Sequence, residues 1–96
     1  MTRYAMLLKF TEKGLAHAKE SPARAAAFKT AATKAGATVE AQYWLLGEYD
    51  GIAILTAPDE ATATAVALKL GSQGNVRTCL CRALDEAEFK AVLAKT

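Results

Sequence analysis

The side chains best suited to chemistry lie in two short segments that contain glycine. Tyr49 and Asp50 end the first segment, where a phenol and a carboxylate can hold or deprotonate a small polar ligand. Asn75 and Arg77 follow the glycines of the second, where backbone N–H groups beside an amide and a guanidinium suit a carboxylate or a phosphate. We therefore predict that these four side chains bind a small anionic metabolite.

Both segments also have a purely structural interpretation. Gly47 supplies the backbone freedom of a turn, Asp50 can bond nearby backbone groups and Tyr49 can pack. Gly71 can end a helix and Asn75 can form a turn without any ligand. Phosphate loops lead into a helix, whereas this glycine loop follows one, so it is not a nucleotide fingerprint. A ligand-free assembly module is accordingly an alternative function.

His17 is the only histidine, so a histidine-based metal cluster cannot form within one subunit. It lies in a polar stretch between a predicted strand and a predicted helix, where we expect it to be exposed. With Tyr49 and Asp50 it provides the proton-transfer candidates if the chain is a cofactor-independent monooxygenase or isomerase. The sequence contains no Ser-His-Asp set and no dinucleotide fingerprint, so we expect no cofactor.

Cys79 and Cys81 lie two residues apart on one face of a predicted strand. This spacing is too tight for an unstrained disulfide, and the other ligands of a zinc site are missing. We interpret both cysteines as small buried apolar residues and predict no metal site. A copper-binding or redox role for the Cys-x-Cys pair is the alternative.

Composition narrows the class of protein further. The 96 residues include 12 Lys and Arg against 10 Asp and Glu, a net charge of +2 whose basic residues are scattered along the chain. Without a basic cluster to follow a phosphate backbone, the sequence argues against nucleic-acid binding. No window approaches the roughly 20 apolar residues of a membrane helix and no signal peptide is visible, so we expect a cytoplasmic protein without membrane contact.

The length of the chain suits one domain over residues 1–96. Hydrophobic periodicity and turn residues predict strands at about 3–10 and 37–46, a third ending near 57 and a fourth at 75–84. Helices are predicted at 21–35, 60–70 and 85–95. The order βαββαβ with a final helix predicts an α+β, ferredoxin-like fold.

The ends and apolar stripes of the helices are also predictable. We expect Ser21 and Pro22 to start the first long helix, Gly36 to end it and Asp59 to cap the second. The stripes expected to face the core are Ala25, Phe28, Ala32 and Ala35 on the first helix and Ala61, Ala65 and Leu68 on the second.

Alternation within the strands predicts which side chains share a face. On the second strand we expect one face to hold Val39, Ala41, Tyr43 and Leu45 and the other to hold Glu40, Gln42 and Trp44. On the third we expect Asp50, Ile52 and Ile54 opposite Tyr49, Ala53 and Leu55, so at most one of Tyr49 and Asp50 enters a pocket under the helices. The turn between these strands is expected at Gly47-Glu48 or at Asp50-Gly51.

Right-handed crossovers place both main helices on one face of the sheet. The first and third strands are nevertheless apolar on both faces, so the face without helices would leave large aliphatic side chains in water. A chain of this length also buries too little surface to be very stable alone. We therefore expect a second copy to cover that face in a symmetric dimer or a larger homo-oligomer, with Trp44 as an interface anchor or, alternatively, a pocket wall.

Three segments carry a family resemblance: Phe10 to Gly14, Tyr43 to Asp50 and Leu70 to Thr78. Together they resemble the GYD domain family, and the similarity runs over nearly the whole chain in the same order. The resemblance implies a dimeric α+β barrel type of fold in a family whose function is largely uncharacterised. It supplies neither a reaction nor a ligand.

Overall fold

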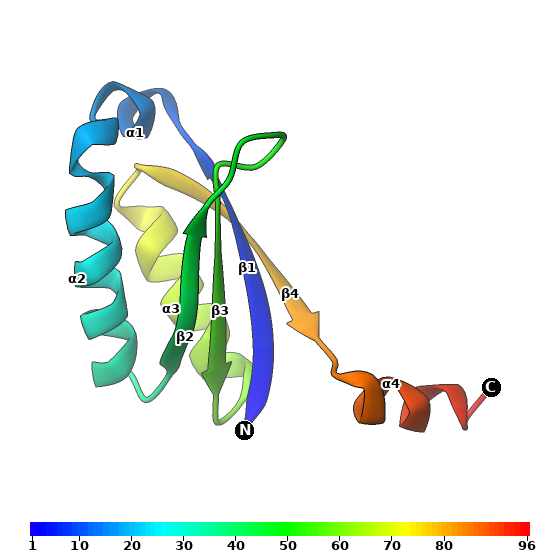
Figure 1. The fold of residues 1–96 in the computed structure, drawn as a ribbon. Helices are drawn as coiled ribbons and strands as arrows, with labels where there is room; N and C mark the ends of the chain where they lie inside the picture. Colours follow the sequence, from blue (N-terminus) through cyan, green and yellow to red (C-terminus); the bar gives the residue numbers. More distant parts are fainter.

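A computed structural model describes residues 1–96, and Figure 1 shows how the elements follow one another. The strands are β1 (Thr2–Phe10), β2 (Thr38–Trp44), β3 (Gly51–Ala57) and β4 (Val76–Ala83). The helices are α1 (Glu12–Ala16), α2 (Ser21–Lys34), α3 (Glu60–Ser72) and α4 (Glu86–Leu93), with a 3₁₀ turn at Ala18–Glu20. Their order confirms the predicted βαββαβ plan with a terminal helix. Helix α1 is an addition to it.

The four strands form one antiparallel sheet in the order β2-β3-β1-β4. This is the strand order of a ferredoxin-like fold, so the predicted α+β class is confirmed. Helices α2 and α3 lie on one side of the sheet, as right-handed crossovers require (Figure 1). We call the side of the sheet that these helices leave uncovered the open face. None of the helices has the length and hydrophobicity of a membrane span.

The core lies between the two long helices and the covered face of the sheet. Met6 and Leu55, from the central strands β1 and β3, are completely buried. Phe28 of α2 and Val66 of α3 belong to the same cluster, in which most of the other residues are alanines. Burying a side chain as large as methionine or leucine stabilises a fold by about 1.5–3 kcal/mol. The core therefore fixes which face of the sheet the helices cover.

A β-bulge in strand β2 changes the predicted faces. Val39 pairs with Leu55, but the next pair is Ala41 with Ile54, so Glu40 is an extra residue. Beyond the bulge Gln42 and Trp44 lie on the covered face with Val39, while Ala41 and Tyr43 lie on the open face. The predicted grouping of Val39 with Ala41 and Tyr43 is therefore wrong, because an extra residue inverts the alternation that a regular strand would keep.

The connection between β2 and β3 corrects the two predicted turns. The last strand pair is Trp44 with Gly51, and residues 45–50 form a longer loop closed by the Leu45 N–H donating to the Asp50 carbonyl at 2.8 Å. Neither Gly47-Glu48 nor Asp50-Gly51 forms a two-residue turn. Because Asp50 lies outside β3, strand alternation does not determine its direction.

The start of α2 also differs from the prediction. Ser21 begins the helix, but its side chain caps no backbone N–H, because the chain enters from the preceding 3₁₀ turn. The helix start that is capped by a side chain is the start of α1. There the Thr11 side chain accepts a hydrogen bond from the backbone N–H of Gly14. At the other end of α2, Gly36 has a φ of 95°, as expected of a glycine that ends a helix.

Helix α3 packs through a different stripe from the predicted one. The buried residues are Ala63, Val66 and Ala67, whereas Ala61, Ala65 and Leu68 are exposed. Both stripes have helical spacing, and the many alanines and threonines give little contrast between the sides of this helix.

The Asp59 side chain accepts a hydrogen bond from the Thr62 N–H at 2.7 Å, which confirms its predicted role as the cap of α3. Gly71 lies inside the helix and is not its cap; the glycine with a positive φ is Gly74, at 83°.

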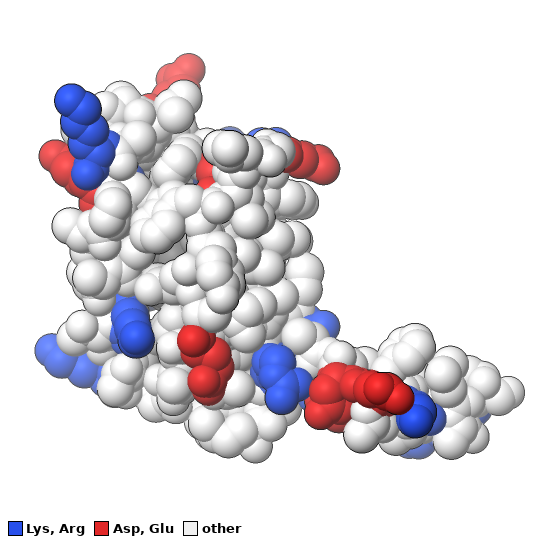
Figure 2. All heavy atoms as spheres, viewed as in Figure 1, with Lys and Arg blue, Asp and Glu red and all other residues white.

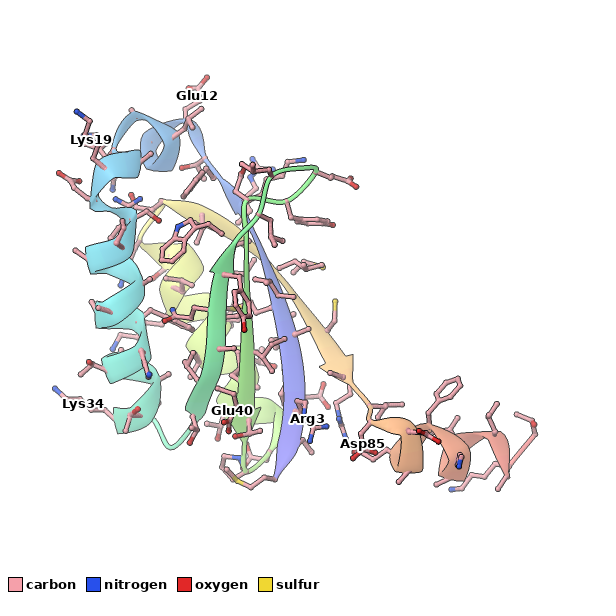
Figure 3. The ribbon with its side chains drawn as sticks, in the orientation of Figure 1. Arg3, Glu12, Lys19, Lys34, Glu40 and Asp85 are labelled. Carbon is pink, nitrogen blue, oxygen red and sulfur yellow. The ribbon has the colours of Figure 1, made fainter.

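Helix α4 extends away from the rest of the molecule beyond the end of β4 (Figure 1). Asp85 and Glu88 cap each other's backbone N–H groups, and Glu88 also forms ion pairs with Arg3 at 3.2 Å and Arg82 at 3.4 Å. Figure 3 shows Arg3 and Asp85 at this junction. The apolar side of α4 has no cover within the chain, since Phe89 remains 52% exposed.

Candidate functional site

A cavity opens between the first turns of α2 and the covered face of the sheet. Its volume is about 60 Å³, which gives room for about four water molecules. Leu8, Phe10, Phe28 and Leu70 contribute to its apolar walls. Its polar lining comes from Ser21, Arg24, Gln42, Trp44, Asp50, Gln73 and Asn75. An apolar hollow with a few polar groups is the usual form of a small-molecule site, although this one suits only a small group.

Asp50 is held beside this cavity by strand β1. Its Oδ2 accepts a hydrogen bond from the backbone N–H of Phe10 at 2.8 Å, and its own N–H donates to the Leu8 carbonyl at 2.8 Å. The β2–β3 loop is thereby tied to the end of β1. The other carboxylate oxygen, Oδ1, has no hydrogen-bond partner in the chain. Because every buried side-chain oxygen and nitrogen does have a partner, Oδ1 of this half-buried residue is accessible to solvent or a ligand.

Two side chains of β2 reach α2 across the cavity because the bulge turns them to the covered face. Trp44 Nε1 donates to Ser21 Oγ at 3.0 Å, and Gln42 Nε2 donates to the Ala25 carbonyl at 3.2 Å. These bonds leave the Gln42 amide oxygen and the serine proton available to a ligand. Trp44 thus forms a wall of the cavity and does not lie on the open face. Its role as an interface anchor stays a prediction.

The positive charge of Arg24 is largely engaged within the chain. Its guanidinium donates to the His17 carbonyl at 2.9 Å and lies 3.7 Å from a carboxylate oxygen of Glu20. These contacts hold the segment between α1 and α2 against the first turns of α2. Asp50 is therefore the one charged group lining the cavity without an opposite charge paired to it in the chain.

The structure separates the four side chains predicted to bind a ligand. Asp50 and Asn75 line the cavity together. Tyr49 lies in the β2–β3 loop and does not line the cavity, and Arg77 points to the open face, opposite Lys9 in the strand register. The charged residues that line a shallow hollow there are Arg77, Lys9 and Lys13, together with the carboxylate of Glu12. The expected carboxylate and guanidinium thus belong to different surfaces.

His17 is exposed, as expected from its position between strand and helix. Its Nδ1 lies 2.9 Å from the carbonyl oxygen of Lys13, within the same turn. It does not line the cavity, so among the three proton-transfer candidates only Asp50 does.

Sequence reasoning missed Gln42, Ser21 and Arg24 as cavity residues. The serine and the arginine lie on the first turns of α2, and their polar type at a helix start is common for other reasons. Gln42 reaches the cavity only because of the bulge at Glu40. No local pattern in the sequence marks that bulge.

A second feature is a band of apolar residues across the open face. The strand register aligns Tyr43, Ile52, Leu7 and Cys79 in one row and Ala41, Ile54, Ala5 and Cys81 in the next. We call these eight residues the apolar band. Charged side chains lie beyond both ends: Arg3 and Glu40 at one, Lys9 and Arg77 at the other. Figure 2 shows charges around the edge of the face in view and an uncharged middle.

The two cysteines are not buried, which corrects the prediction. Cys79 is exposed and Cys81 is partly exposed, because both lie on the open face of the edge strand β4 and no helix covers them. Their Sγ atoms are 3.8 Å apart and form no disulfide. Two effects raise the pKa of the Cys81 thiol: its hydrogen bond to Cys79, which is the larger, and its partial burial.

Two carboxylates at helix starts have altered acidity. At the start of α3, hydrogen bonds from Thr62 lower the pKa of Asp59; the bond from its backbone N–H has the larger effect and the bond from its side chain the smaller. The backbone N–H of Asp85 lowers the pKa of Glu88, and the guanidinium of Arg82 adds to the effect. Both groups serve helix capping, so these shifts mark structural sites and no catalytic acid or base.

The four-stranded antiparallel sheet with two helices on one side defines a ferredoxin-like α+β protein. The sequence model of the GYD domain matches residues 4–93, and the chain therefore belongs to the GYD domain family. This membership confirms the resemblance seen in the three sequence segments.

A relative from Thermus thermophilus is named glutamine synthetase and cystathionine beta-lyase binding protein. It is 40% identical to this chain over 58 residues, which cover 60% of this chain and 61% of the relative. The matched region therefore spans about three fifths of that relative. No solved structure matches the chain.

Proposed function

We propose that this chain is a protein-binding module that docks on a metabolic enzyme through the apolar band. The band carries the proposal, because protein interfaces combine an apolar centre with a charged rim. Arg3, Lys9, Glu40 and Arg77 form such a rim around the band. The relative's name supports an enzyme such as glutamine synthetase or cystathionine beta-lyase as the partner.

The size of the band indicates how it would be used. Two residue rows across four strands cover roughly 19 by 14 Å, since strands lie about 4.8 Å apart and alternate residues about 6.8 Å. Such an area is about a third of the roughly 800 Å² that a standard interface buries per partner. The rim charges and the exposed apolar side of α4 are the surfaces that would complete it.

Binding of the purified chain to each of the two enzymes tests the proposal. We expect immobilised enzyme to retain the chain, and Tyr43→Ala to weaken binding at least about 30-fold, as loss of a tyrosine hot spot of about 2 kcal/mol would. Tyr43 is 62% exposed, so its removal should leave the fold intact. Leu68→Ala is the matched control, because Leu68 is 68% exposed on the outer side of α3. Equal loss in both variants, or no binding to either enzyme, contradicts the proposal.

The homodimer expected from the sequence is proposed for the same surface. A second copy would bury the band by packing sheet against sheet, giving the dimeric α+β barrel that the family resemblance implies. Self-association and enzyme docking would then exclude each other. We also keep the prediction that the protein forms a single domain and works in the cytoplasm, where free cysteines such as Cys79 and Cys81 stay reduced.

The cavity supports a second candidate function, the binding of a small molecule. Asp50 and Asn75 converge there, and the unpaired carboxylate favours a ligand group that donates hydrogen bonds over an anion. The anionic metabolite expected from the sequence fits better beside Lys9, Lys13 and Arg77. The monooxygenase or isomerase alternative keeps Asp50 as its proton-transfer candidate at the cavity.

Amide chemical shifts measured during titration with methylammonium and with acetate separate these ligand classes. We expect methylammonium to shift residues around Asp50, and Asp50→Asn to reduce the response. Acetate should shift residues around Arg77 instead. Shifts spread over the whole surface with both probes would argue against either site.

A further inference from the structure

The two cysteines of β4 form a paired thiol site at the edge of the sheet. Cys79 and Cys81 point to the open face, with their Sγ atoms 3.8 Å apart and neither in a disulfide. Their neighbours across the strand register are Leu7 and Ala5 of β1, and β4 has no strand on its other side. A ligand can therefore approach both sulfur atoms from the free edge of the sheet.

The geometry of β4 disfavours a disulfide bond between Cys79 and Cys81. Alternate residues of a strand have Cα atoms about 6.8 Å apart, the upper limit for a disulfide, whose sulfur atoms lie about 2.05 Å apart. Closing the bond would therefore strain β4 between its pairs with β1. The two thiols are kept as neighbours without being joined.

A metal ion, in contrast, fits the observed separation. Two thiolates on a tetrahedral ion with metal–sulfur distances of about 2.3 Å lie about 3.8 Å from each other. The two sulfur atoms already have this spacing. We propose that Cys79 and Cys81 chelate one thiophilic metal ion of the Zn²⁺, Cd²⁺ and Cu⁺ class. The proposal rests on the sulfur geometry alone; because both cysteines belong to the apolar band, a partner docked on the band would compete with metal binding.

The ligand set determines which ions the pair accepts. No group of three or more His, Cys, Asp or Glu side chains is placed to hold a metal ion in the chain, so the two thiols stand alone. Thiolates select soft ions and bind Mg²⁺ or Ca²⁺ poorly. The remaining coordination positions are open to water or to a small thiol such as glutathione.

Binding exchanges protons for metal. Each cysteine loses its S–H proton to solvent as a metal–sulfur bond forms, so one divalent ion releases two protons and no redox partner is needed. Metal affinity should therefore rise with pH.

Titration of the full chain with Cd²⁺ tests the site. We expect the ultraviolet absorption of cadmium–thiolate bonds to saturate at one ion per chain. Native mass spectrometry should show one added cadmium and the loss of two protons. The second thiolate of a chelate binds intramolecularly, so Cys79→Ser and Cys81→Ser should each weaken binding on the order of 10²–10⁴-fold.

Ala83→Ser is the matched control, because Ala83 lies on the same face of β4, and it should leave the affinity unchanged. Circular dichroism of each variant establishes that β4 stays folded, which the exposure of Cys79 leads us to expect. Single-cysteine variants that bind Cd²⁺ as tightly as the native chain would overturn the proposal. So would a chain that closes an internal disulfide in air and thereby loses Cd²⁺ binding.

Discussion

Asp50 joins two segments that are far apart in the sequence. Its carboxylate accepts the Phe10 N–H at the end of β1, while its backbone closes the loop that follows β2. Hydrogen bonds to a charged group contribute about 1.5–3 kcal/mol, more than neutral ones. The residue therefore has a structural role at the cavity in addition to any contact with a ligand.

We expect Asp50→Ala to lower the free energy of unfolding by about 1.5–3 kcal/mol, because it leaves the Phe10 N–H without its acceptor. Asp50→Asn keeps a neutral acceptor and should cost less. Glu48→Ala, in the same loop and exposed, should change stability by less than about 0.5 kcal/mol. Urea unfolding measures all three, and equal values for Asp50→Ala and Glu48→Ala would show that the Phe10 contact contributes nothing.

Gly14 is required by a close contact between α1 and Asn75, the residue before β4. A side-chain carbon at this position would overlap the carbonyl group of Asn75, whereas a carbon at Gly71 would meet open space. We expect Gly14→Ala to destabilise the chain by about 1–3 kcal/mol through overpacking. Gly71→Ala, in the last turn of α3, should stabilise it by up to about 1 kcal/mol. Thermal unfolding of the pair tests this, and shifts of the same sign would contradict it.

At the scale of elements, the bulge in β2 sets up both candidate surfaces. By adding Glu40 to one strand, it turns Trp44 toward α2 and Tyr43 toward the open face. Without it, alternation from Val39 would place tyrosine over the cavity and tryptophan in the apolar band. One extra residue thus decides which aromatic side chain serves which surface.

Helix α4 depends on its capping box because no other element covers it. The pKa of Glu88 is lowered from its ordinary value of 4.5. Its carboxylate therefore contributes its full stabilisation of the folded helix at pH values above 4.5. This contribution is lost as the pH falls through the lowered pKa. We therefore expect α4 to fray between about pH 4.5 and the lowered pKa, before the sheet unfolds.

Amide and side-chain NMR signals across this pH range measure the effect. In Glu88→Gln the residues of α4 should lose this pH dependence. Signals of α3, which is capped by Asp59 and packed on the core, provide the internal reference. Simultaneous loss of the α3 and α4 signals would show that the cap of α4 does not control the transition.

At the scale of the whole molecule, helices cover one face of the sheet and leave the other face exposed. The covered face holds the core, while the apolar band leaves Tyr43 and Cys79 exposed. We expect concentration-dependent dimerisation in sedimentation velocity, weakened by Tyr43→Ala and unaffected by Leu68→Ala. Added partner enzyme should convert the dimer to a complex with the chain. A single monomeric species at all concentrations would contradict the predicted homodimer.

The arrangement of the fold could be predicted from the sequence to a large extent. Local signals sufficed for the order of strands and helices: the apolar run of β1, the cap at Asp59 and the glycine at Gly36. The candidate site was less predictable. Asp50 and Asn75 do meet at the cavity, but Arg77 lies on the open face, because the register of β4 against β1 turns it there.

The sequence by itself determined the βαββαβ plan and the family, because hydrophobic period, helix caps and turn residues act over a few neighbouring residues. Only the tertiary structure decided what each surface contains. The bulge at Glu40, the longer loop before Gly51 and the exposure of Cys79 all depend on pairing or cover between distant segments. Such pairing is set by the packing of the whole sheet, and no local pattern encodes it.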